Sequence, residues 1–363
     1  MTYPEILNAF ALPEGDRTAV PFGNGHINNT FLVRISGTDK QYILQRINSY
    51  VFVRPRDVME NIQRVTSHLQ QKILAAGGNP ERETLCLIPT LSGEACAEDA
   101  EGQIWRVFLF VPDTFSPELP DDPAILEECG RAFGRFACLL NDFPVSSLHE
   151  TIHAFHDTPA RLCQLEEAAV KNVCGRLQEV TEELTFARSR AADTRILTDA
   201  LAAGRLPLRV THNDTKVNNV LLDRNTSKAV CVIDLDTVMP GLLAYDFGDA
   251  VRVGACSAAE DEQDLSLIRL ELPKYRAFAS GFLSSLKGIL SRDELLSLEA
   301  GARLMTLENG LRFLTDHLNG DVYFRIHRPG QNLDRARAQF ALFRDMDQHS
   351  EEARAILLDL YHE

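Results

Sequence analysis

The chain has 363 residues, of which 45% are hydrophobic and 25% charged, as in a globular protein with a substantial core. Its formal net charge of -15 argues against broad binding to a nucleic-acid backbone or to an anionic membrane surface. The length suggests about two domains, and no apolar run approaches the roughly 18 residues that a membrane span needs.

The eight cysteines are scattered along the chain and form no CxxC pair. Several lie in apolar surroundings, such as Cys231 in "AVCVID", which fits a reducing compartment better than a disulfide framework or a zinc site. The N-terminal residues lack the basic flank and apolar core of a signal peptide. We therefore expect a soluble cytoplasmic protein that has neither nucleic-acid nor membrane partners.

The first 110 residues favour strands around a single helix. Residues 56–74 carry apolar side chains at 58, 62, 65, 69 and 73, the spacing of one helical face. The segments that favour strands are residues 19–35, which contain a Gly/Asn turn, 41–47, 85–91 and 104–111. A β-rich N-lobe over residues 1–112 is the interpretation that follows.

The character of the sequence changes near residues 111–120, where prolines and acidic residues interrupt the apolar pattern. Helices are expected over residues 125–143, with small residues at contact positions, and over much of 160–204 and 263–318. Two short strands, in 208–223 and 229–236, flank a polar loop. This order predicts an α+β fold in which a mainly helical C-lobe, residues 113–363, follows the N-lobe.

The polar loop "VTHNDTKVNNVLLD" carries the groups that phosphoryl transfer requires. Asp214 would take the proton of the acceptor hydroxyl, and Lys216 would offset the developing charge. Asn219 and Asp234, which ends the strand "AVCVI", would hold Mg²⁺. The spacing from Asp214 to Asn219 is that of the kinase loop H-R-D-x-x-x-x-N. The alternative is an elaborate turn between strands. Any one of these polar residues would be compatible with such a turn, but their presence together, in this order, favours the catalytic interpretation.

A second candidate metal motif lies downstream, in "YDFGD". Asp246 begins the sequence Asp-Phe-Gly, which is the metal-binding motif of protein kinases. Asp234 is nevertheless favoured as the metal ligand, because its strand is expected to pair with "VLLD" and so to return Asp234 beside Asn219. Asp246 and Asp249 are instead expected to cap or brace the segment and to hold the loop backbone.

The N-lobe offers a nucleotide site between its first two strands. Gly23 and Gly25 would let backbone N–H groups approach phosphate oxygens, and Arg46 and Phe110 are further nucleotide-binding candidates. Gln45 and Arg46 lie on opposite faces of the third strand, and neither is the lysine that kinases place there. Which of the two faces the nucleotide stays open.

Several blocks resemble a known family: "GNGHINNTFLV", "YILQRIN", "AFHDTP", "LPLRVTHNDTKVNNVL", "DLDTVMPG" and "LRFLTDHLNGDVYF". They are similar to the aminoglycoside phosphotransferase and choline kinase superfamily, and more narrowly to the bacterial N-acetylhexosamine 1-kinases. The resemblance implies a protein-kinase-like two-lobe fold, ATP and Mg²⁺. It also implies phosphorylation of the anomeric (C1) hydroxyl of N-acetylglucosamine or N-acetylgalactosamine. Asp214 matches the catalytic base, and Asn219 and Asp234 match the metal ligands. Asp236 stands where many kinases have glycine, which would add a carboxylate near the metal or the sugar.

The resemblance also implies sugar contacts from Arg312 and Tyr323, with Asp321 nearby. Without it, Arg312 would be assigned to a surface ion pair with Glu308, one helical turn away. A leucine stripe marks this helix, at residues 304, 307, 311, 314 and 318, and Asn319-Gly320 is expected to end it.

Three histidines have competing interpretations. His26 lies in the glycine segment, where its imidazole could reach the sugar or a phosphate, and it is kept among the substrate-binding candidates. For His153 and His156, a structural role at a helix entry, with Thr158 as N-cap, is favoured over a metal site because no third ligand is near.

Two other functions compete with a sugar 1-kinase. The first is another small-molecule kinase, acting on an aminoglycoside, choline or homoserine. The second is a catalytically inactive kinase fold that serves as a binding module. The presence of Asp214, Asn219 and Asp234 together argues against the second.

Overall fold

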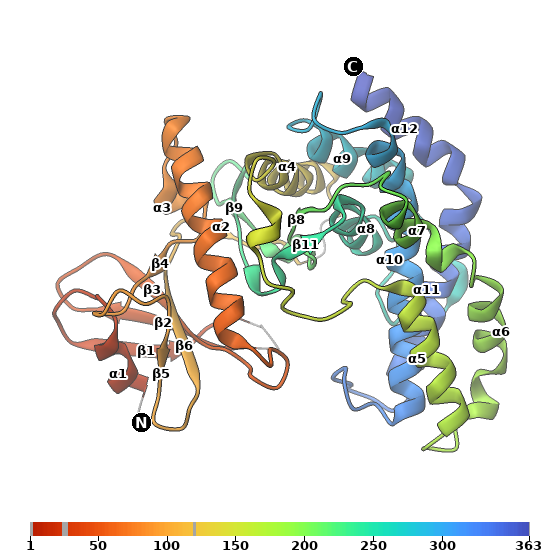
Figure 1. The fold of residues 1–363 in the computed structure, drawn as a ribbon, viewed down its shortest axis with the longest axis horizontal. Helices are drawn as coiled ribbons and strands as arrows, with labels where there is room; N and C mark the ends of the chain where they lie inside the picture. Colours follow the sequence, from red (N-terminus) through yellow and green to blue (C-terminus); the bar gives the residue numbers. More distant parts are fainter. Residues whose placement is uncertain (1–2, 24–27, 119–120, 363) are drawn as a thin grey trace. The chain divides into compact units, whose positions relative to one another are not determined.

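The computed structural model describes residues 3–23, 28–118 and 121–362 and has an α+β fold (Figure 1). Its residues form two compact units. The first unit contains Met1–Ser116, Leu139–His153 and Asn219–Pro240, and the second contains Pro117–Cys138, Ala154–Asn218 and Gly241–Glu363. This grouping brings later segments together with the N-terminal residues, and the contiguous boundary at residues 112/113 stays a prediction.

The first unit is built on an antiparallel sheet with the strand order β1-β2-β3-β6-β4, in which β5 also pairs with β6. Its strands are β1 (Arg17–Pro21), β2 (Asn29–Ile35), β3 (Gln41–Arg46), β4 (Leu87–Ile88), β5 (Ala97–Glu98) and β6 (Ile104–Leu109). Its helices are α1 (Tyr3–Ile6), η1 (Leu7–Ala9), α2 (Pro55–Ala75), α3 (Pro80–Glu83) and η2 (Val145–Ser147). The predicted stripe of α2 is confirmed, since all five of its apolar side chains are buried.

A smaller antiparallel sheet in the first unit has the order β10-β9-β7. Its strands are β7 (Thr114–Phe115), β9 (Val220–Asp223) and β10 (Ala229–Val232). The predicted pairing of "VLLD" with "AVCVI" is therefore confirmed. After β10 come η6 (Leu235–Thr237) and β11 (Met239–Gly241).

The second unit is mainly helical (Figure 1). Its long helices are α4 (Pro123–Leu139), α5 (Thr158–Lys171), α6 (Thr181–Ser189), α7 (Ile196–Ala202), α8 (Leu243–Gly254), α9 (Leu272–Leu283), α10 (Arg292–Asn319), α11 (Gln331–Gln348) and α12 (Ser350–His362). Short elements are η3 (Leu177–Val180), η4 (Asp193–Arg195), β8 (Arg209–Thr211), η5 (Val217–Asn219) and η7 (Leu265–Leu267). The leucine stripe of α10 is buried, as predicted, and Gly320 ends this helix at φ 97°.

Glycines allow helices of the second unit to pack at short distance. A Cβ atom on Gly134 of α4 would lie 2.0 Å from the carbonyl oxygen of Phe282 on α9. A Cβ on Gly248 of α8 would lie 2.3 Å from the carbonyl oxygen of Gly301 on α10. The glycine of "DFGD" therefore serves helix packing, which is a physical reason for its presence apart from any metal motif.

The helices expected over much of 160–204 are present as α5, α6 and α7, and α5 ends where Asn172 adopts a left-handed φ of 40°. Other sequence expectations need correction. Asp157, not Thr158, caps α5, because its carboxylate accepts from the backbone N–H of Ala160. The helices α8, α11 and α12 were not predicted; α8 begins without a side-chain cap, so the usual start signal is missing from its sequence.

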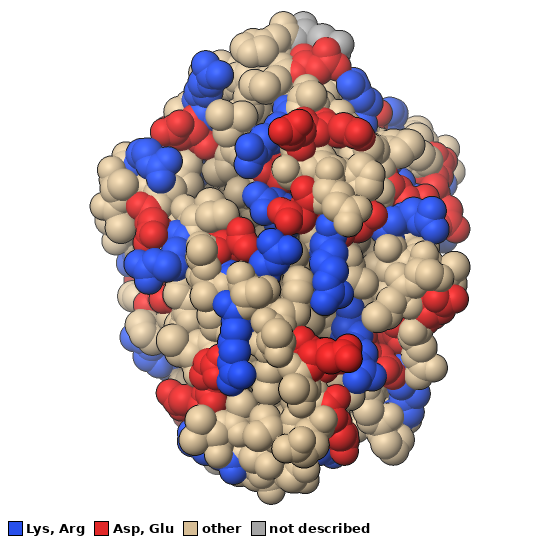
Figure 2. Space-filling view, turned by 90° about the vertical axis from the view of Figure 1, so that its right-hand side faces the viewer, with Lys and Arg blue, Asp and Glu red and all other residues tan. Residues whose placement is uncertain are grey.

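The cysteines are all free, although only Cys96, Cys129 and Cys231 are buried and Cys163 and Cys174 are exposed. In the described part of the chain, no helix is both long and apolar enough to cross a membrane. On the face that Figure 2 shows, acidic and basic side chains are interspersed.

Candidate active site

The loop with Asp214 is held in the second unit by the carboxylate of Asp246, at the start of α8. The backbone N–H groups of His212 and Asn213 donate to its two oxygens, at 2.8 and 2.7 Å. The hydroxyl of Thr215 donates to the backbone carbonyl of Asp246. The expectation that Asp246 holds the loop backbone is thus confirmed. Asp249 instead pairs with Arg252 on its own helix.

A buried histidine just before the start of α5 contacts the same loop. His156 Nε2 lies 3.4 Å from the backbone oxygen of Asn213, which has a left-handed φ of 63°. His156 Nδ1 lies 2.9 Å from the carboxylate of Glu308, and Thr158 donates to the other oxygen of that carboxylate. The structural role predicted for His156 is confirmed. The alternative interpretation, a surface ion pair between Glu308 and Arg312, is wrong, because Glu308 is fully buried with His156 and Thr158 as partners.

Asp214 and Lys216 form an ion pair of 2.9 Å within this loop. Burial raises the pKa of Asp214, but the charge and hydrogen bond of Lys216 outweigh it, and the pKa lies below its usual value. The charge of Asp214 in turn raises the pKa of Lys216. The pair therefore supplies an ionised carboxylate and a cation side by side.

We expect Lys216→Met to move the acid limb of the kcat/KM profile to higher pH. Without the ammonium, burial dominates and the pKa of Asp214 rises. A base must be deprotonated to act, so activity is then lost at a higher pH as the solution is acidified. The measurement is kcat/KM against pH, with Lys287→Met, an exposed lysine on the same unit, as the control. An unmoved acid limb in Lys216→Met would contradict this role of Lys216.

The two predicted metal ligands lie together in the first unit. The backbone N–H of Ile233 donates to the carbonyl oxygen of Asn219, at 2.9 Å, so the strand pairing brings Asp234 next to Asn219, as predicted. Asp234 has a left-handed φ of 62° and is exposed, whereas Leu235 after it is buried. A carboxylate and an amide oxygen are hard donors of the kind that Mg²⁺ takes together with substrate phosphates. Their chemistry fits the ion, and the ligation itself stays a prediction.

The predicted nucleotide residues are only partly within the described chain. Gly23 has φ 77°, a conformation that favours glycine, whereas Gly25 and His26 lie outside the described residues. Phe110 packs edge to face on Phe22, with ring centroids 5.8 Å apart. Their nucleotide contacts stay predictions.

The expectation that Gln45 and Arg46 face opposite ways is confirmed. Gln45 donates to Thr30 and accepts from Nε of Arg106, whereas the Arg46 guanidinium lies over the Trp105 ring, 5.9 Å from its centroid. The sequence interpretation did not identify Arg106, although a charged residue inside the apolar strand "IWRVFLF" was a visible signal. Its guanidinium forms a buried ion pair with Asp236, whose other oxygen accepts from Asn28 at 2.6 Å. The extra carboxylate expected near the metal or the sugar is therefore neutralised inside the first unit.

The predicted sugar residues lie around the C-terminal end of α10. The Arg312 guanidinium lies over the rings of Phe155, Tyr323 and Phe324, within 5.9 Å of each centroid. Tyr323 is 60% exposed, whereas the Asp321 carboxylate is buried against Arg176 and Asn332. The structure thus shows Asp321 fixing the loop, and sugar contacts by the three residues stay predictions.

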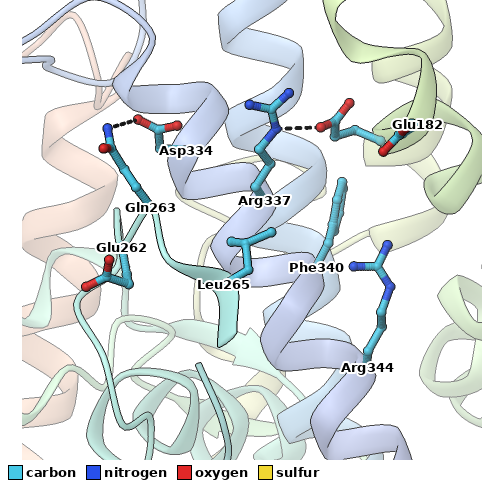
Figure 3. A pocket seen from close by; sticks show the side chains of 9 residues that line it. Glu182, Glu262, Gln263, Leu265, Asp334, Arg337, Phe340 and Arg344 are labelled. Carbon is cyan, nitrogen blue, oxygen red and sulfur yellow. Dashed lines mark hydrogen bonds and ion pairs between the residues drawn. The ribbon is translucent and has the colours of Figure 1, made fainter. Parts of the chain in front are cut away.

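A separate pocket of about 320 Å³ lies in the second unit and contains none of the predicted site residues (Figure 3). Its lining side chains come from α6, α11, the start of η7 and the segment just before it. Three of its six charged side chains already have partners inside the pocket: Arg337 pairs with Glu183, and Asp334 accepts from Gln263. We assign no part of the predicted reaction to it.

Comparison with known proteins places this geometry in a family. The model of the phosphotransferase enzyme family matches residues 18–280. The chain belongs to this family.

Solved structures share the fold at low sequence identity. An aminoglycoside phosphotransferase from Alicyclobacillus acidocaldarius is 14% identical with a TM-score of 0.60, over 100% of this chain and 96% of that one. A choline kinase from Cryptosporidium parvum is 14% identical with a TM-score of 0.53, over 96% and 94% of the two chains. A spectinomycin phosphotransferase in complex with ADP and spectinomycin is 12% identical with a TM-score of 0.53, over 96% and 97%. These structures support the protein-kinase-like two-lobe fold.

Proposed function

We propose that this phosphotransferase uses ATP to phosphorylate the anomeric hydroxyl of N-acetylhexosamines, giving the sugar 1-phosphate. The observation that carries the choice of acceptor is Arg312, a cation among aromatic rings in the second unit. The described residues give Arg312 one hydrogen bond, to the side-chain oxygen of Asn309 at 3.4 Å, and no ion pair within 4 Å. Its donors therefore suit a hydroxyl or an acetamido carbonyl of an uncharged sugar.

A second guanidinium strengthens the positive charge of this region. Arg161 donates to the backbone carbonyl of Phe155, the residue whose ring lies under Arg312. Burial and the neighbouring Arg312 lower the pKa of Arg161. Aminoglycosides and choline carry positive charge, so two adjacent arginines oppose such acceptors. The exposed ring of Tyr323, at the same place, suits stacking on the apolar face of a sugar.

The reaction can be assigned to residues of this chain. Asp214, kept ionised by Lys216, would accept the proton of the C1 hydroxyl of the sugar. The oxygen of that hydroxyl would bond to the γ-phosphorus of ATP while the bond between the γ-phosphorus and the β–γ bridging oxygen breaks. An anomeric hydroxyl is more acidic than an ordinary alcohol, so a carboxylate is an adequate base. Lys216 would stabilise charge on the transferred group. Mg²⁺, held by Asn219 and Asp234, would neutralise phosphate charge.

The acceptor assignment is tested by ADP release across N-acetylglucosamine, N-acetylgalactosamine, glucose, galactose, kanamycin and choline. We expect the acetamido sugars to be preferred, by as much as about 10⁴-fold, because polar groups built to bind the acetamido group stay unpaired with the other sugars. We expect little discrimination at C4. NMR of the product should show phosphate on C1; phosphate on any other carbon, or turnover of choline or kanamycin alone, would overturn the proposal.

We further expect Arg312→Ala to raise the KM for the sugar by about 10-fold or more and the KM for ATP by less than about twofold. The loss of this charged hydrogen-bond donor should weaken the binding of the sugar and leave the binding of ATP nearly unchanged. Arg344→Ala is the matched control. Arg344 also lies over an aromatic ring of the second unit, that of Phe186, but it is exposed and is not among the predicted sugar residues. A defect in the KM for ATP alone would place Arg312 outside the acceptor site.

A further inference from the structure

The first unit contains a buried arginine whose hydrogen bonds are incomplete. Arg106 on β6 is 1% exposed. Its Nε donates to Gln45 at 2.9 Å, and its Nη1 donates to Asp236 and contacts the sulfur of Met59. Among the residues that the structure describes, none accepts a hydrogen bond from Nη2 of Arg106.

This guanidinium lies where two functional segments of the first unit meet. Asp236 is two residues after the predicted metal ligand Asp234 and belongs to the same turn, η6. The other oxygen of Asp236 accepts from Asn28, which follows the glycine segment in sequence, and the side chain of Asn28 in turn accepts from the backbone N–H of Asn48. Arg106 is therefore tied to the metal turn directly and to the end of the glycine segment through Asp236.

Stability alone is a weak reason for such a pair. Desolvation of two buried charges often cancels their attraction, and well-packed apolar residues can replace them at little cost. A guanidinium fixed on two sides and carrying a spare donor is, in contrast, well suited to bind a phosphate oxygen. Gln45 lies opposite Arg106 on β3, the strand on which kinases carry their phosphate-binding lysine, and its side chain accepts from Arg106.

We propose that Arg106 is the cation that binds a phosphate group of the nucleotide, and that Gln45 and Asp236 orient its guanidinium for this contact. The inference rests on the proposed use of ATP. It assigns the charge that is missing from β3 to the neighbouring strand, β6. The rival candidate is Arg46, whose guanidinium lies over Trp105 instead.

The test measures the dissociation constants of ADP and of adenosine, with Mg²⁺, by calorimetry on the full chain. The central variant is the double substitution Arg106→Met with Asp236→Leu, which removes the pair without leaving one charge buried alone. We expect its affinity for ADP to fall about 10- to 100-fold and its affinity for adenosine to stay within about twofold, because only ADP carries phosphate. Arg34→Met, an exposed arginine on β2 of the same sheet, should change neither constant.

Arg106→Lys provides a second test if the double variant fails to fold. It keeps the charge but loses the forked geometry, so the affinity for ADP should again fall selectively. ADP binding within twofold of wild type in the folded double variant or in Arg106→Lys would overturn the inference. An equal loss of ADP and adenosine affinity would do the same, as would a selective loss of ADP affinity in Arg46→Met alone. A wild-type chain that binds no ADP at all would instead refute the proposed function.

Discussion

The Asp214→Asn variant should lose about 10²–10⁴-fold in kcat, the usual contribution of a general base. Asparagine keeps the size of the side chain and can still accept a hydrogen bond from Lys216, but it cannot accept the proton of the acceptor. The loop should keep its conformation, because Asp246 and His156 hold its backbone at His212 and Asn213. The measurement is single-turnover phosphoryl transfer, together with calorimetry of ADP binding.

Two observations complete this experiment. The dissociation constant of ADP should stay near that of the wild type, since the base acts on the acceptor. Asp199→Asn, which removes an exposed carboxylate paired with Arg195, is the control and should leave kcat unchanged. A rate above about one third of wild type in Asp214→Asn would disprove its assignment as the base.

The second large effect is a contrast between two aspartates, Asp234 and Asp246. Asp234→Asn should weaken the activation by Mg²⁺ by at least about tenfold while leaving the free energy of unfolding nearly unchanged. Asparagine tolerates the left-handed conformation of this position, so backbone strain does not confuse the result. Asn219→Ala should show the same loss of activation, because Asn219 is the other predicted ligand.

Asp246→Ala should act on stability instead. It leaves the buried N–H groups of His212 and Asn213 without an acceptor, so the free energy of unfolding should fall by about 2–5 kcal/mol. Urea unfolding measures this loss, and Mg²⁺ titration of the same variants measures activation. Asp246→Asn keeps one acceptor oxygen and should lose less stability. Loss of Mg²⁺ activation in the Asp246 variants with normal activation in Asp234→Asn would reverse the two assignments.

The sequence determined the parts of the site that depend on order along the chain. Asp214, Lys216 and Asn219 lie in one loop, and the apolar strand after it had to pair back on "VLLD", which brings Asp234 next to Asn219. A strand pairing between neighbouring segments is local, so spacing and periodicity are enough to predict it. The same is true of the buried leucine stripe of α10 and of its end at Gly320.

Tertiary structure alone decided which partners the buried charges take. Arg106 and Asp236 are 130 residues apart in sequence, and Glu308 meets His156 across 152 residues. Periodicity tells which face of a strand or helix is buried, but a single charged residue on that face does not indicate what lies opposite. For that reason the alternative interpretation of Arg312 paired it with Glu308 at the surface, and Arg106 was overlooked although it lies next to Gln45. The pairing of buried charges depends on how distant elements pack, because low-dielectric surroundings make every unpaired charge costly.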